Sequence, residues 1–478
     1  MGLVNNVKWV SCSQLVKVAC QLLGMVIFSR YLTPAQIGLM SMTLIVVNFV
    51  NVLRDMGSSA AVIQREIITD SLKCSVFTLN LSLGIFLFIC SYILSDYLAI
   101  FFNEPDVSET IKVISLAFPI NSITAIHLAL LERDSKFHLT AKVEVISSAL
   151  ALCISVILAI YGAGVYSLVA QTLLYSILSA LGFWYYSGWI PKGVGKLSDI
   201  KSIFSFSSNL VCFNILNYFS RNADQIMIGR YFSASILGQY SLAYRVMLFP
   251  IQNITFVLTR SLYPILSRLQ NDHKSAIDSY FTTLKVIAVI IPPLMFGVAS
   301  VSKEFVSVVF GDAWNDIANM LVWLAPVAVL QSMVSTTGSV FMSQARTNLL
   351  LKISIYNAFL QITSFVIGVF YSVSVLIKLY LLANILMFIP NMYLAISMLH
   401  GSFLSFLNLI FKPIISACAM SICILISTPF FISLNLPVFY VLISKISIGV
   451  LSYSVFIIIF ERKYVAKQLK YLLNYRKR

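Results

Sequence analysis

Two polar, basic stripes recur 200 residues apart in this chain. Within each stripe the residues are three or four positions apart, which places their side chains on one face of a helix. The stripes are Gln14, Lys17 and Gln21 in the first half, and Asn214, Asn217 and Arg221 in the second. Both lie inside hydrophobic stretches long enough to cross a bilayer. A duplicated basic stripe inside a membrane protein favours a central site for a large anionic ligand.

Further polar residues lie inside the apolar stretches near these stripes. Each Lys, Arg or Asp at the bilayer centre costs roughly 2.5–3.5 kcal/mol against lipid, so such residues should face a hydrated cavity or a partner. Arginine suits phosphate because its planar group donates two parallel hydrogen bonds, and amide side chains suit the hydroxyl groups of sugars. The predicted substrate-binding residues are Lys17, Gln21, Asn48, Asn51, Asp55, Asn214, Asn217, Arg221, Asp224 and Arg245.

Internal ion pairing is the alternative interpretation of these charges. Glu144 and Asp224 could neutralise one or two of the bases, and Asp55 could pair with Arg54 or Lys17. Bases outnumber acids near the apolar stretches, which leaves positive charge for a ligand. Two other repeated pairs are weaker candidates. Arg30 and Arg230 lie at helix ends, where their charged groups reach the interface, and Gly38 and Gly238 are better explained as packing or turn positions.

The composition indicates an all-α integral membrane protein. The chain has 478 residues, of which 59% are hydrophobic and only 11% are charged, with a mean hydropathy of +0.90. A soluble domain averages about 25% charged residues. The net charge of +15 is dispersed and fits the positive-inside rule better than a nucleic-acid surface.

The eight cysteines show no metal-ligand spacing. The first apolar stretch is too long for a signal peptide and should remain as a membrane helix.

Apolar stretches of about 20 residues predict about fourteen transmembrane helices. The expected spans are 8–30, 36–56, 74–98, 109–131, 141–161, 164–186, 203–223, 235–258, 280–302, 317–340, 348–370, 374–397, 405–427 and 437–460. The breaks between them alternate, because the even-numbered ones are mostly basic and the odd-numbered ones are mostly neutral or acidic. Even-numbered breaks and both chain termini should therefore face the cytoplasm.

The repeat predicts the domain organisation. Residues 1–200 would form an N-terminal six-helix lobe and residues 201–400 a C-terminal six-helix lobe. Residues 401–460 would add two transmembrane helices, and residues 461–478 would form a basic cytoplasmic tail. Because six crossings separate the two copies, the lobes should be parallel repeats with the substrate path between them.

Enzymatic motifs are absent from the sequence. There is no P-loop, no GxSxG nucleophile motif, no His/Cys cluster and no loop long enough for a soluble catalytic domain. The sequence therefore predicts a transporter that is not an enzyme and that holds no cofactor or metal. Coupling to a proton gradient, a sodium gradient or the membrane potential stays open.

The chain resembles the multidrug/oligosaccharidyl-lipid/polysaccharide exporter superfamily, and within it the polysaccharide-transporter branch. The matching stretches are Ser29–Gly38, Arg54–Ala60, Asp224–Arg230, Leu237–Ala243, Pro250 and Pro264–Ser267. The resemblance implies a V-shaped fold of two six-helix lobes with a cationic central cavity. It also implies a flippase that moves a polyprenyl-pyrophosphate-linked oligosaccharide, such as an O-antigen or exopolysaccharide repeat unit, across the bacterial inner membrane.

Three other functions remain as alternatives. A peptidoglycan-precursor flippase of the same superfamily would share the cationic cavity. A multidrug or cation antiporter would need intramembrane carboxylates, whereas the first apolar stretch carries Lys17 and no acid. A membrane polysaccharide polymerase should carry a sizeable extracytoplasmic loop, which is not expected here. Expected partners of the flippase are the lipid-linked oligosaccharide, membrane lipids and other polysaccharide assembly proteins, with no nucleic acid.

Overall fold

The structure is a computed structural model that describes residues 3–54, 62–63, 68–193, 195, 214–215 and 217–462. Within these residues all regular structure is helical, and thirteen candidate membrane spans meet the length and hydropathy of a bilayer crossing. The fold class is therefore confirmed as an all-α membrane protein. Residues 203–213 of the expected seventh span lie outside the described residues, whereas residues 217–231 are helical.

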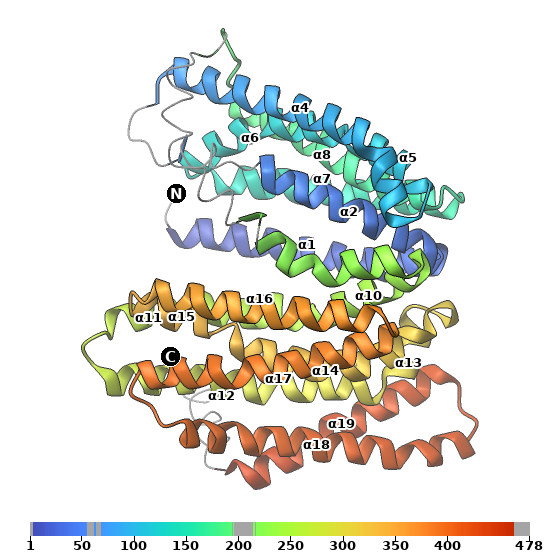
Figure 1. The fold of residues 1–478 in the computed structure, drawn as a ribbon, viewed down its shortest axis with the longest axis vertical. Coiled ribbons are helices and arrows are strands. Elements are labelled where there is room, and N and C mark those ends of the chain that lie inside the picture. The colour runs from blue at the N-terminus through green and yellow to red at the C-terminus, as the bar shows by residue number, and fades with distance from the viewer. Residues whose placement is uncertain are drawn as a thin grey trace. The chain divides into compact units, whose positions relative to one another are not determined.

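The chain divides by its internal contacts into an N-terminal unit, Met1–Gly238, and a C-terminal unit, Gln239–Arg478. The boundary falls inside one helix, so the segment 214–238 with the second stripe is grouped with the N-terminal unit. Each unit is described by itself below, and Figure 1 shows their helices.

The N-terminal unit contains seven labelled helices and the helical residues 217–231. The labelled helices are α1 (Leu3–Tyr31), α2 (Pro34–Arg54), α4 (Asp70–Phe102), α5 (Asp106–Ile114), α6 (Ala117–Arg133), α7 (Phe137–Ile160) and α8 (Val165–Ser187). Helix α7 packs between α1 and α8, while α6 packs against α4 and α8. The contact of α1 with α7 determines which side chains lie opposite the basic stripe on α1.

The C-terminal unit begins inside α10 (Ala234–Pro250) and continues through the helices that follow. These are the π-helical segment η1 (Ile251–Thr255), α11 (Phe256–Arg268), α12 (His273–Ser300), α13 (Ser302–Val309), the 3-10 turn η2 (Asp312–Trp314), α14 (Asn315–Val334), α15 (Thr337–Ser343), α16 (Thr347–Val369), α17 (Val373–Met398), α18 (Phe403–Ser433) and α19 (Val438–Phe460). Helices α18 and α19 run side by side (Figure 1), and α18 packs along α12.

Several expected helix boundaries were wrong, in most cases because helices continue past the last apolar residue. The expected break 259–279 is shortened to the few residues between Arg268 and His273, since α10, η1 and α11 form one candidate span. Asp272 shapes the start of α12, because its carboxylate accepts a hydrogen bond from the Ser275 N–H at 3.0 Å. Two expected helices, 109–131 and 317–340, are each interrupted by a turn near one end.

Intramembrane prolines were expected to kink helices. The structure places Pro292, Pro293, Pro326 and Pro390 within continuous helices. Pro250 ends α10 and is followed at once by the π-helical turn Ile251–Thr255. A wider turn at this point is the usual way to accommodate the missing proline N–H.

Gly38 and Gly238, which are 200 residues apart, meet at a close crossing of α2 with the first turn of α10 inside the N-terminal unit. A Cβ atom on Gly38 would lie 1.7 Å from the carbonyl oxygen of Ala234, and one on Gly238 would lie 2.0 Å from the carbonyl oxygen of Pro34. No side chain fits in this space, so the two backbones approach as only glycine allows. The interpretation of these glycines as packing positions is confirmed.

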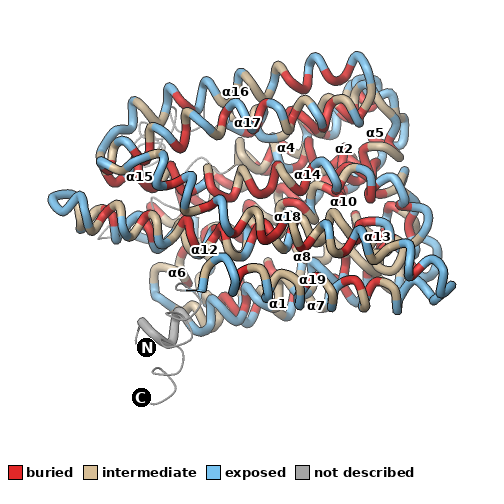
Figure 2. The backbone as a smooth tube through the Cα atoms, turned by 90° about the horizontal axis from the view of Figure 1, so that it is seen from below, coloured by how far each residue is buried: buried red, intermediate tan, exposed pale blue. Residues whose placement is uncertain are grey.

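Burial varies widely among the helices. Figure 2 shows exposed residues recurring along α16, and about a sixth of its span is buried, against 61% for the span Asp312–Ser343 that contains α14. Exposed apolar side chains are expected on helices that face lipid acyl chains. Helix α16 is therefore a peripheral helix of its unit, and α14 is a central one.

Candidate functional site

Lys17 on α1 does not stand alone in the membrane. Its ammonium nitrogen lies 2.8 Å from the Oε2 atom of Glu144 on α7, and the two side chains are 33% and 25% exposed. The pairing alternative is therefore confirmed for Lys17. Its neighbours on the stripe, Gln14 and Gln21, are exposed. This end of the predicted site is thus a solvent-reachable ion pair flanked by amides.

The polar stripe on α2 is only partly described. Asn48 is exposed and Asn51 is half-buried, whereas Asp55 lies outside the described residues. The Oδ1 atom of Asn51 is buried and has no hydrogen-bond partner among the described residues. A buried amide oxygen without a hydrogen-bond partner is costly.

The second stripe is oriented by an aromatic contact with α2. The hydroxyl of Tyr218 donates a hydrogen bond to the carbonyl of Ile45, and the Tyr218 ring packs against Phe49 with a centroid distance of 5.6 Å. This contact buries one face of the helix. Asn217 and Arg221, one turn apart, are left exposed, and Asn214 is half-buried. No described carboxylate forms an ion pair with Arg221.

Asp224 does not share the exposure of this stripe. Its side chain is fully buried, and its Oδ1 atom accepts a hydrogen bond from the Gln225 N–H at 2.8 Å. A carboxylate in this position contributes to the packing of the helix and not to an open surface. Among the predicted ligand-contacting residues that the structure describes, Asp224 is the one that the geometry favours least.

Arg245 lies on α10 in the C-terminal unit and is exposed. In the part of that unit that the structure describes, the ion pairs join Lys285 to Glu461 and Lys445 to Glu304, and none includes Arg245. Arg245 is therefore a cation within the candidate span Ala234–Arg268 that has no ion-pair partner among the described residues. Such a group needs water or an anionic ligand.

Arg230 has a structural role. Its Nη1 atom donates to the carbonyl of Phe101 at 2.7 Å and to the Oδ1 atom of Asn103 at 3.0 Å, and its guanidinium lies over the Phe101 ring. These contacts tie the end of the helix 217–231 to the end of α4. They explain the residue without any ligand.

Two ion pairs of the C-terminal helices were missed in the sequence. The Lys445 ammonium on α19 lies 2.6 Å from a carboxylate oxygen of Glu304 on α13, and Lys445 is 2% exposed. Lys285 on α12 pairs with Glu461 and also donates to the carbonyl of Leu409 at 3.1 Å. The only available signal was a lysine inside an apolar stretch, because the partners are more than 140 residues away.

Among the described residues no cluster of His, Cys, Asp or Glu could hold a metal ion.

Comparison with known proteins gives the family. The family model described as "Polysaccharide biosynthesis protein" matches residues 27–319, which is more than half of the chain. The chain belongs to this family. The matched region contains Arg221, Arg245 and Glu144, but not Lys17.

Curated relatives carry names from surface-polysaccharide assembly. The lipopolysaccharide biosynthesis protein WzxC of Escherichia coli K12 is 27% identical over 76% of this chain and 75% of its own. The teichuronic acid biosynthesis protein TuaB of Bacillus subtilis is 27% identical over 73% of this chain and 72% of its own. An uncharacterized membrane protein in the cps region of Klebsiella pneumoniae is 28% identical over 97% of this chain and 96% of its own.

Solved structures agree on the fold. The lipid II flippase MurJ, in an inward closed conformation, matches with a TM-score of 0.76 at 16% identity, over 97% of this chain and 100% of its own. An inward-facing MATE transporter of the MOP superfamily matches with a TM-score of 0.61 at 14% identity, over 83% of this chain and 99% of its own. These likenesses show a shared all-α fold, and the thirteen candidate spans among the described residues make the chain a multi-pass membrane protein.

Proposed function

We propose that the protein is a flippase for a polyprenyl-pyrophosphate-linked oligosaccharide, such as an O-antigen or exopolysaccharide repeat unit, in the bacterial inner membrane. The observation that carries this proposal is the family match over residues 27–319. It is supported by relatives named for lipopolysaccharide, teichuronic acid and succinoglycan biosynthesis, the last of which is called a transport protein. On this proposal the protein moves its substrate without breaking a bond, and so it is not an enzyme.

The proposed mechanism is alternating access through a cationic central cavity. The sugar-pyrophosphate head enters the cavity from the cytoplasm, the prenyl tail stays in lipid, and rearrangement of the helices then exposes the head on the other side. Both termini are cytoplasmic on this proposal, as the alternation of basic and neutral breaks indicates.

The cationic contacts are assigned to Arg221 and Arg245. Both residues are exposed, and neither guanidinium has an ion-pair partner among the described residues. Each guanidinium can bind a pyrophosphate oxygen pair through two parallel hydrogen bonds. Gln21, Asn48, Asn51, Asn214 and Asn217 supply amides for the sugar hydroxyls, and Asp55 and Asp224 remain proposed contributors. Lys17, already balanced by Glu144, has a smaller share of the anionic head.

Deletion and complementation in the source bacterium test this function. The deletion strain should lose its surface polysaccharide and accumulate the lipid-linked oligosaccharide in the cytoplasmic leaflet, where a membrane-impermeant sugar oxidant added to intact spheroplasts does not reach it. The wild-type gene should restore both. Rescue of a strain lacking its peptidoglycan-precursor flippase, or restored export of a cationic dye in place of polysaccharide, would contradict the proposal and identify a sister function.

A further inference from the structure

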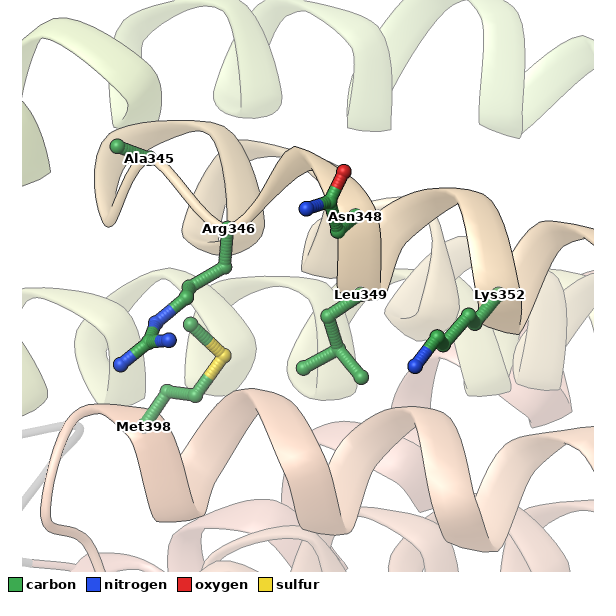
Figure 3. A pocket seen from close by; sticks show the side chains of 6 residues that line it. All are labelled: Ala345, Arg346, Asn348, Leu349, Lys352 and Met398. Atoms are coloured by element: carbon green, nitrogen blue, oxygen red, sulfur yellow. The ribbon is translucent and has the colours of Figure 1, made fainter.

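A basic pocket lies at the start of α16 in the C-terminal unit. It has a volume of about 460 Å³ and is lined by Ala345, Arg346, Asn348, Leu349, Lys352 and Met398. Figure 3 shows the side chains of Arg346, Leu349 and Lys352 directed from α16 toward α17, with Met398 directed back toward them. Two cations and two apolar side chains therefore share one small space.

The two cations have no described counter-charge. Arg346 and Lys352 are both exposed, and no described carboxylate forms an ion pair with either of them. Arg346 is also the N-cap residue of α16, and the positive end of that helix dipole adds to the field. The pocket therefore favours an anion with several oxygen acceptors.

The same polar pattern occurs in the N-terminal unit, 210 residues earlier. Lys136, His138 and Lys142 stand where the pocket has Arg346, Asn348 and Lys352. The backbone repeats as well, because Ser135 and Ala345 both have a φ of 54° immediately before the N-cap residue of their helix. The pocket is thus one copy of a duplicated helix start, not an isolated surface feature.

The two copies differ in how their charge is balanced. In the first, Lys136 pairs with Asp134 at 2.8 Å, and Lys142 lies over the Tyr186 ring. In the second, Gln344 stands in place of Asp134. The counter-charge has therefore been lost only in the copy that forms the pocket. This difference indicates that an external anion balances Arg346 and Lys352.

The surface of α16 beyond the pocket indicates what this anion is attached to. Lys352 continues into a stripe of exposed apolar residues that are three or four positions apart, and so share one helix face. They are Ile355, Phe359, Ile362 and Val366, with exposed fractions of 61%, 66%, 37% and 38%. A cationic pocket at a helix end, followed by an apolar stripe along the helix, matches a phosphate head with attached hydrocarbon chains.

We infer that this pocket binds the phosphate group of a membrane lipid, with the lipid chains lying along the exposed stripe of α16. Arg346 holds the phosphate oxygens with its planar donors, while Lys352 adds a second charge six residues further along. The lipid phosphate comes either from an anionic phospholipid or from a polyprenyl phosphate. The inference does not depend on the proposed transport activity.

Native mass spectrometry of the full-length protein tests this inference. The protein would be released from nanodiscs of phosphatidylcholine with phosphatidylglycerol, and retained phosphatidylglycerol would be counted. The wild type should retain one tightly held copy. Arg346→Gln with Lys352→Gln should weaken retention about fivefold for each charge removed, and so roughly 30-fold together. The exchange Arg346→Lys with Lys352→Arg keeps both positive charges and should retain more lipid than the double Gln variant, and an unchanged thermal unfolding midpoint of the Gln variant shows that its loss is not misfolding.

The first copy supplies the matched control. Lys136→Gln with Lys142→Gln removes the same charge from the equivalent helix start and should leave retention unchanged. Competition identifies the lipid, because displacement by undecaprenyl phosphate below the phosphatidylglycerol concentration assigns the site to a polyprenyl lipid, and resistance assigns it to a phospholipid. Equal retention by wild type and the Arg346/Lys352 variant would overturn the inference. Displacement by inorganic pyrophosphate as effective as by lipid would also overturn it.

Discussion

The ammonium of Lys17 lies 2.8 Å from a carboxylate oxygen of Glu144, and this ion pair joins α1 to α7 within the N-terminal unit. The second half of the chain lacks both members. Asn217 stands 200 residues after Lys17, and Ser354 stands 210 residues after Glu144. Loss of both charges together is what a structural pair requires, since either charge alone in the membrane is costly. Arg221 in the second stripe forms no ion pair with any carboxylate in the part of the chain that the structure describes.

Double substitution at this pair should show whether Lys17 and Glu144 stabilise each other. Lys17→Gln or Glu144→Gln alone leaves one charge unbalanced, and we expect each to lower stability by about 1–2 kcal/mol given the partial exposure. Lys17→Gln with Glu144→Gln should recover most of this loss. Thermal unfolding of the purified protein in detergent measures the three variants. Purely additive losses in the double variant would show that the two side chains do not depend on each other.

Removal of one side of the buried pair on α19 should be more damaging. Lys445→Met leaves Glu304 without its partner beside the apolar cluster of Val301, Met420, Ile424 and Leu442. Breaking a buried pair on one side costs about 3–5 kcal/mol. Lys445→Met with Glu304→Leu removes both charges and should restore most of the stability. The yield of monodisperse protein and its midpoint of thermal unfolding report the effect, and an equally unstable double variant would refute this assignment.

Glycine-to-alanine substitution should lower stability strongly at the close crossing of Gly38 and Gly238, and little at a glycine with open space around it. Gly38→Ala places a methyl group 1.7 Å from the Ala234 carbonyl oxygen, so α2 and the first turn of α10 must separate. Overpacking of this kind costs about 1–3 kcal/mol or more. Gly338→Ala is the matched control, because a Cβ there meets nothing within 4 Å and alanine favours the helix. A Gly38→Ala protein as stable as the Gly338→Ala protein would contradict the close approach.

Local features of the structure were predictable from the sequence, and long-range pairs were not. Apolar stretches predicted the helices, and constant offsets of 200 identified Gly38 and Gly238 as related positions. Helix ends were less predictable, because α11 extends to Arg268 through polar residues that remain in regular helix. The wide turn Ile251–Thr255 could be expected only as a consequence of Pro250.

In the candidate site, too, local exposure could be predicted from the sequence, whereas contacts between distant residues could not. Exposure of Asn217 and Arg221 follows from their spacing, but the burial of Asp224 depends on which helix face Tyr218 fixes against α2. Partners such as Lys17 and Glu144 are 127 residues apart, and Lys445 and Glu304 are 141 apart. Hydrophobic periodicity says nothing about which helices become neighbours. Arg346 and Lys352 do not indicate an anion site when their own helix start is considered alone. They indicate one only when that helix start is compared with the equivalent one at Lys136 and Lys142.

The most direct test of the central claim is transport in proteoliposomes. The purified protein would be reconstituted with the lipid-linked oligosaccharide isolated from the deletion strain, and a membrane-impermeant sugar oxidant would report how much substrate reaches the other leaflet. We predict that Arg221→Gln with Arg245→Gln lowers the flipping rate by about tenfold or more at unchanged thermal stability. The control Arg268→Gln with Lys274→Gln, which removes the same charge at exposed positions near helix ends, should keep the wild-type rate. A wild-type rate in the Arg221/Arg245 variant would contradict the assignment of these guanidinium groups to the pyrophosphate.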